Sequence, residues 1–249
     1  MATDPGGSSS PAAFAEMARS LLAEEDVQKT LQRIVELAVE TIGGCDHAGV
    51  TILHGGTFST PAFTDAVPVA VDAIQYETGE GPCVDAIRDH EVFRTGDLGH
   101  EARWPAFSAR AQRETGVTSM MGFRLFIAGD TLGALNLFSK APDAFDDAAS
   151  AAGSVFAAHA AIALSTALHD EQMNQALESR DIIGQAKGIL MAKEGVTADQ
   201  AFDMLRRASQ RLNMKLRAVA EDIARTGVTP RSAPSSPPPV VPEGDALRG

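Results

Sequence analysis

The stretch IIGQAKGILMAKEG, residues 182–195, has a helical pattern although it contains two internal glycines. A glycine inside a helix costs roughly 1 kcal/mol relative to alanine. On a helical wheel the apolar side is Ile182, Ile183, Ala186, Ile189 and Leu190, and the opposite side is Arg180, Gly184, Lys187, Gly188 and Met191. Glycines on an exposed face let another backbone come close. That backbone belongs either to a ligand or to a second helix, because small residues also ease helix packing and dimerisation.

Two further amphipathic helices follow this stretch. Gly195 suits a helix C-cap, and Thr197 to Gln200 has the pattern of a capping box that opens the second helix. The second helix is predicted to pack through Ala201, Phe202, Leu205, Ala208 and Leu212, and the third, after Asn213, through Leu216, Val219, Ala220 and Ile223. With Phe202 assigned to this core, no aromatic side chain accompanies the cations, so base stacking is not expected.

The charge of the chain is unevenly distributed. The formal net charge is −12. Residues 178–226 hold nine Lys and Arg against seven Asp and Glu, a net charge of +2, so the remainder carries −14. A basic segment beside an acidic one points to a polyanionic partner.

Residues 178–224 resemble an ANTAR domain, the three-helix RNA-binding output module of bacterial transcription antiterminators. The matching positions are Arg180, Ile183, Ala186 to Gly188, Leu190, Met191, Gly195, Ala201, Leu205, Arg206, Ala208, Val219 and Ala220. The resemblance implies a homodimer that binds paired RNA hairpins with small loops in nascent transcripts and prevents a terminator from folding. The expected RNA-binding residues are Arg180, Gly184, Lys187, Gly188, Arg206, Arg207, Arg211 and Lys215.

The pattern before this module mixes strands with helices. Helices are predicted over 13–42 and 104–116, and strands over 47–53, 57–63, 117–129 and 131–140, the last two forming a hairpin. Strands at hairpin spacing among helices indicate an α+β domain with a mainly antiparallel sheet. Residues 146–194 are helical almost without a break, which is long for one compact domain and indicates a linking or paired helix.

The N-terminal module resembles a GAF domain. The resemblance lies in GEGPC (79–83), DL (97–98), RWPAF (103–107) and LGALNLFS (132–139) followed by AFDD. Together the two resemblances are similar to the GAF–ANTAR regulators of actinobacterial type. The GAF resemblance implies a small-molecule pocket between sheet and loops, but the ligand and any cofactor stay unknown, because a fold does not identify them. The signature of cyclic-nucleotide-binding GAF domains is missing.

Cys83 is the candidate sensor residue. It is the candidate nucleophile of the sequence, and oxidation of its thiol is one hypothesis for the input signal. The alternative, a half-buried structural thiol in a tight loop, fits better, because the six histidines have no readable spacing to it. Catalytic and metal-ligating residues are therefore not assigned, and the chain is not expected to be an enzyme.

The whole sequence then divides into four segments. Residues 1–12 and the Pro- and Ser-rich tail 227–249 are expected to be disordered, 13–168 to form the GAF sensor with flanking helices, and 169–226 to form the ANTAR domain. Neither a membrane span nor a secretory signal is visible, so a cytoplasmic protein is expected. Two alternatives stay open: a DNA-binding regulator of helix-turn-helix type, and a GAF-domain enzyme with a dimerising helical tail.

Overall fold

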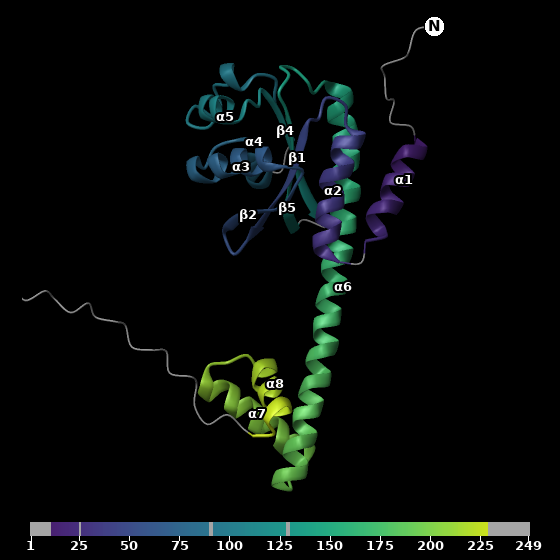
Figure 1. Ribbon diagram of the computed structural model, residues 1–249, viewed down its shortest axis with the longest axis vertical. Coiled ribbons are helices and arrows are strands. Elements are labelled where there is room, and N and C mark those ends of the chain that lie inside the picture. Colours follow the sequence, from purple (N-terminus) through teal and green to yellow (C-terminus); the bar gives the residue numbers. More distant parts are fainter. Residues whose placement is uncertain (1–10, 25, 90–91, 128–129, 229–249) are drawn as a thin grey trace, which may run out of the picture. The chain divides into compact units, whose positions relative to one another are not determined.

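The computed structural model describes residues 11–24, 26–89, 92–127 and 130–228 (Figure 1). They fall into two compact units, one ending at Glu171 and one beginning at Gln172. Residues 1–10 and 229–249, both predicted to be disordered, lie outside the described residues.

Five antiparallel strands form the sheet of the first unit. They are β1 (His47–His54), β2 (Thr57–Phe63), β3 (Phe93–Thr95), β4 (Ser119–Ile127) and β5 (Asp130–Ser139), in the spatial order β2-β1-β5-β4-β3. The β4–β5 hairpin pairs Ser119 with Ser139 and Ile127 with Asp130, and β1 pairs with the other side of β5. The predicted antiparallel α+β fold is confirmed. The short β3, which sequence patterns did not reveal, adds an outer strand.

Helices cover both faces of this sheet (Figure 1). On one face, α2 (Val27–Thr41) and the first half of α6 (Asp147–Glu194) bury a core that includes Ile34, Val35, Phe156 and Leu164 against β1, β4 and β5. On the other face lie α3 (Ala66–Thr78), α4 (Pro82–Asp89) and α5 (Ser108–Thr115), with a short 3₁₀ helix at Leu98–His100. Sequence analysis did not predict α3 or α4.

The predicted single helix over residues 13–42 is wrong. The chain forms α1 (Pro11–Leu22) and then α2, so the predicted disorder of residues 1–12 is wrong for Pro11 and Ala12, which lie in a helix. The break follows from a cap: the carboxylate of Asp26 accepts a hydrogen bond from the Lys29 backbone N–H at 2.7 Å, which starts a new helix there.

The helix predicted over residues 104–116 begins four residues later than predicted, at Ser108, as α5. Trp104 precedes it and is buried, and its indole N–H donates to the Asp85 carboxylate at 2.6 Å. The other end agrees with the prediction, since Gly116 caps α5 in the left-handed conformation.

The second unit contains the three predicted helices: the end of α6, α7 (Ala198–Leu212) and α8 (Leu216–Thr226). Their common core consists of Ala186, Leu190, Ala201, Leu205, Ala208, Val219, Ala220 and Ile223. Thr197 and Gln200 form the predicted capping box, and Gly195 and Asn213 turn the chain with positive φ.

By length and composition alone, helix α6 is long and apolar enough to cross a membrane. Its most apolar 18-residue window has a mean hydropathy of 1.5, and 44% of that window is buried. Its buried residues Phe156, Ala160 and Leu164 pack against the sheet. This is the behaviour of a core helix in a globular domain.

Candidate nucleic-acid interface

Most of the α6 surface predicted to be open is exposed, whereas Lys187 is half-buried. Arg180, Gly184 and Gly188 are exposed, whereas Ala186 and Leu190 are buried against α7 and α8. A Cβ atom at Gly184 or Gly188 would meet nothing within 4 Å in the described part of the chain. Packing inside this unit therefore does not require either glycine. They keep a strip of helix backbone accessible.

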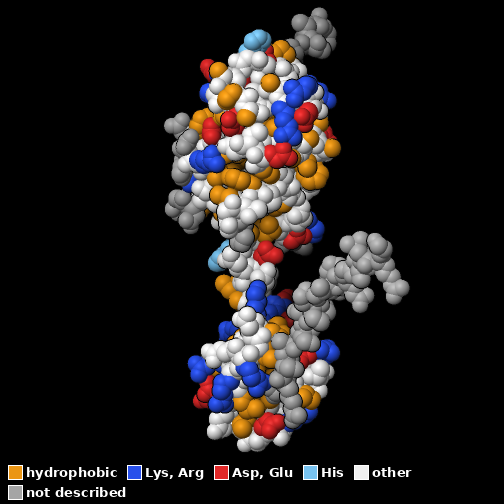
Figure 2. All heavy atoms as spheres, turned by 90° about the vertical axis from the view of Figure 1, so that its left-hand side faces the viewer, with side chains coloured by type: hydrophobic (Ala, Val, Ile, Leu, Met, Phe, Trp, Pro, Cys, Tyr) orange, Lys and Arg blue, Asp and Glu red, His pale blue; other side chains and the backbone are white. Residues whose placement is uncertain are grey.

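The cations of this unit differ in whether they are already neutralised. Arg217 pairs with Glu178 at 3.1 Å and with Glu221 at 2.8 Å, hydrogen bonds that raise its pKa, and Arg225 pairs with Asp222. Within the described ranges, the side chains of Arg180, Arg207 and Lys215 make no ion pair or hydrogen bond, and all three residues are exposed. Figure 2 shows Lys and Arg side chains among hydrophobic ones on one face of this unit.

Phe202 does not lie in the core, so that prediction is wrong. Its side chain is 39% exposed, and the Lys187 ammonium group lies 5.9 Å from the centre of its ring. Neighbouring positions on a helix are about 100° apart, and the adjacent Ala201 faces the core instead. An aromatic ring therefore does accompany the cations, contrary to the sequence-based expectation.

The predicted contact residues do not all share one surface. On α7, Arg206 lies one turn after Phe202, on the flank that faces Lys187, and pairs with Asp203 at 3.1 Å. Arg207 and Arg211 fall on the opposite flank of the same helix. Lys215 stands at the N-cap position of α8.

The first unit contains a buried polar cluster that sequence analysis missed. It comprises Thr51 of β1, Thr60 of β2, Asp72, Gln75 and Tyr76 of α3, Cys83 of α4 and Asn136 of β5. At its centre Asp72 is fully buried and accepts hydrogen bonds from Thr60 and Gln75, each at 2.9 Å. The side-chain oxygen of Asn136 has no partner among the described residues. Burial raises the pKa of Asp72 to about 6.

This raised pKa predicts a pH dependence of stability. Because the folded state holds the Asp72 proton more tightly than the unfolded state, the contribution of Asp72 to the free energy of unfolding should fall as pH rises from about 4 to about 6. Asp72→Asn has no ionisable group at this position, so its free energy of unfolding lacks this pH dependence. The stability difference between wild type and variant should therefore change by up to about 3 kcal/mol between pH 4 and pH 7. Urea unfolding of both proteins across this pH range measures the difference. If the free energy of unfolding depends on pH in the same way in both proteins, the raised pKa of Asp72 is contradicted.

Cys83 is fully buried in α4 and not half-buried in a loop, so that description is wrong. Its thiol lies 3.1 Å from the Thr51 hydroxyl, and burial, followed by the nearby Asp72 charge, raises its pKa. A buried thiol that resists ionisation is a poor nucleophile and reacts slowly with oxidants. The geometry therefore disfavours Cys83 as a redox sensor.

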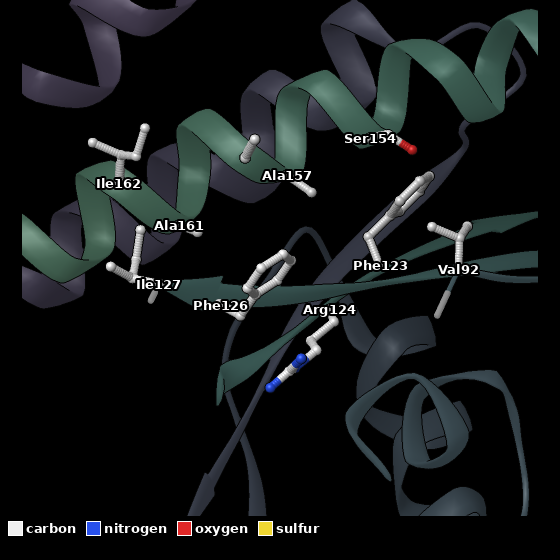
Figure 3. A pocket seen from close by; sticks show the side chains of 10 residues that line it. Val92, Phe123, Arg124, Phe126, Ile127, Ser154, Ala157, Ala161 and Ile162 are labelled. Carbon is white, nitrogen blue, oxygen red and sulfur yellow. The ribbon is translucent and has the colours of Figure 1, made fainter. Parts of the chain in front are cut away.

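A pocket of about 420 Å³ lies between β4 and α6. In Figure 3, Phe123 of the strand lies toward Ser154 and Ala157 of the helix, and Arg124 points away from the helix. The Arg124 guanidinium donates instead to the Thr131 hydroxyl at 2.8 Å. Eight of the ten residues that line the pocket are apolar, the exceptions being Arg124 and Ser154.

Comparison with known proteins agrees with the two units. A GAF-domain family model matches residues 24–165, more than half of the chain, and an ANTAR-domain family model matches residues 171–223. No curated protein matches the chain.

Solved structures support the same fold. The GAF domain of a phosphoenolpyruvate-protein phosphotransferase from Acinetobacter is 15% identical with a TM-score of 0.51, covering 63% of this chain and 92% of that one. Free methionine-R-sulfoxide reductase from Neisseria meningitidis, in complex with its substrate, is 17% identical with a TM-score of 0.51, covering 68% and 95%. At these identities the likeness concerns the fold alone. The chain belongs to the GAF-domain family and carries a C-terminal ANTAR domain, which is the domain content of a GAF–ANTAR regulator.

Proposed function

We propose that this protein is a cytoplasmic, homodimeric, RNA-binding regulator of transcription antitermination. Its ANTAR domain binds paired hairpins in nascent transcripts and keeps a terminator from forming, under the control of the GAF domain. The observation that carries the proposal is the open α6 surface, where Arg180 and Lys187 stand beside two glycines with no packing role. Cations supply phosphate contacts, and glycines let a folded RNA backbone approach closely.

The charge distribution makes such binding strongly dependent on salt. The −14 outside residues 178–226 repels a polyanion at long range, so attraction has to come from the exposed cations of the ANTAR domain. Each phosphate contact releases counterions, and affinity falls steeply as salt rises.

The test compares hairpin RNA with duplex DNA of matched sequence across a salt series. The hairpins are chosen by sequencing the RNA that copurifies with the full-length protein. Tight binding to hairpins and weak binding to the duplex support the proposal. Preference for duplex DNA would favour a DNA-binding regulator instead.

The glycine at position 188 provides a size series. Gly188→Ala and Gly188→Leu should each raise the stability of the ANTAR domain, by up to about 1 kcal/mol, because the position is helical and unobstructed. RNA affinity should fall as the side chain grows, with leucine the weaker binder. Thermal unfolding and fluorescence anisotropy measure the two effects, and equal affinity across the series would exclude close approach of RNA at this position.

Exposed apolar residues on α6 support a homodimer. Met173 and Leu177 are 51% and 52% exposed, and the side chains of residues 169–178 are all exposed. A helical segment gains most of its stability from packing against a partner. A second copy of the chain would cover these residues, and sedimentation of the full-length protein tests the dimer.

The input to the GAF domain would act through α6. Ala161 and Ile162 line the apolar pocket, and the same continuous helix carries Gly184 and Lys187. A small molecule in the pocket therefore contacts the helix that ends in the RNA-binding surface. The enzyme alternative has no comparable support, because its one candidate nucleophile, Cys83, is buried.

A further inference from the structure

Phe202 occupies an unusual position for a phenylalanine in a small helical bundle. Its side chain is 39% exposed, although Ala201, Leu205 and Ala208 of the same helix are buried. A core role does not explain a large ring left partly in water at this position. The ring does, however, belong to the surface that carries the open glycines and cations.

The groups around the ring have the chemistry of a nucleotide site. Lys187 holds its ammonium group 5.9 Å from the ring centre, and Arg206 lies one helical turn away with a 61% exposed side chain. The Arg206–Asp203 pair is exposed on both sides and is therefore weak enough to exchange for a phosphate. On α6, Gly184 lies about one turn before Lys187 and Gly188 directly follows it, so neither position adds a side chain beside the lysine.

An aromatic face beside phosphate-binding cations suits a base that is not paired. Bases inside a duplex already stack on their neighbours and offer no free face, whereas bases in loops can stack on aromatic side chains. Accordingly, we propose that Phe202 stacks on an unpaired loop base of the RNA, with Lys187 and Arg206 binding the flanking phosphates. This inference rests on the proposed RNA-binding function and adds Phe202 as the side chain that contacts an unpaired base.

The experiment couples a protein variant to a nucleotide change. A pool of RNA hairpins with a randomised short loop is selected on the full-length wild-type protein. The best hairpin is then remade with an abasic site at each loop position in turn. Wild type, Phe202→Leu and Phe202→Trp are measured against all of these RNAs by fluorescence anisotropy.

For wild type, one abasic position should weaken binding about tenfold, a typical size for the loss of one stacked base. Phe202→Leu should bind the intact hairpin about tenfold more weakly and lose nothing further at that abasic position. Phe202→Trp should bind as tightly as wild type, because it keeps an aromatic face. A merely apolar or structural role would tolerate leucine, which keeps the hydrophobic surface without the ring.

Three other outcomes would contradict base stacking by Phe202. If wild type enriches no hairpin, the proposed RNA function fails. If wild type binds but Phe202→Leu is equally sensitive to every abasic position, stacking is overturned while RNA binding stands. A change of oligomeric state in Phe202→Leu, with unchanged RNA affinity, assigns the ring to self-association and also overturns the inference. Circular dichroism verifies the fold of each variant.

Discussion

Arg180→Glu combined with Lys187→Glu should weaken binding to hairpin RNA by a factor on the order of 100 to 1000 while leaving the fold intact. Arg180 is exposed and Lys187 is half-buried on the same side of α6, and glutamate is a good helix former. Opposing a phosphate with a carboxylate costs several kcal/mol, which corresponds to this loss. The slope of log affinity against log salt should also become shallower, by about 0.7 to 0.9 for each phosphate that the protein no longer neutralises. Anisotropy titrations in several salt concentrations measure both effects.

A matched control separates the surface from the net charge. Lys193→Glu combined with Arg225→Glu changes the charge of the same domain by the same amount. Those two side chains bind groups at the end of α8: Lys193 donates to the Gly227 carbonyl at 2.8 Å, and Arg225 pairs with Asp222. The control should bind RNA several-fold more weakly at most. Equal losses in both double variants would mean that RNA senses only overall charge.

The sequence predicted the α6 surface well because its information is local. The apolar residues at 3.6-residue spacing identify Ala186 and Leu190 as core positions, and the structure buries both. The capping box at Thr197 and the cap at Gly195 are equally local, so the ends of these helices were predictable too. A wheel applied to α7 places Phe202 beside Arg206, away from Ala201.

The features that the sequence did not predict are non-local. Thr51 and Asn136 are 85 residues apart and meet only because β1 pairs with β5, and Asp72 joins them from a helix that sequence patterns did not reveal. No spacing rule connects these three positions. The burial of Cys83 has the same origin, since α4 places it against Thr51.

The second large effect concerns the core of the ANTAR domain. Leu205→Ala should unfold this domain while the GAF domain stays folded. Leu205 is fully buried among the eight residues of the three-helix core. Replacing a buried leucine with alanine costs about 2–5 kcal/mol, which is comparable to the whole stability of a small domain. RNA binding should be lost with the fold.

Hydrogen exchange measured by mass spectrometry resolves this effect along the chain. In Leu205→Ala, the amides of α7 and α8 should exchange rapidly, whereas those of β4 and β5 should stay protected. The first half of α6 should stay protected too, because Phe156 and Leu164 belong to the core of the GAF domain and not to that of the ANTAR domain. Arg207→Ala is the control, since it truncates an exposed residue of the same helix and should leave exchange unchanged. Loss of protection in β4 and β5 as well would mean that the two domains unfold as one cooperative unit, against the separation of their cores.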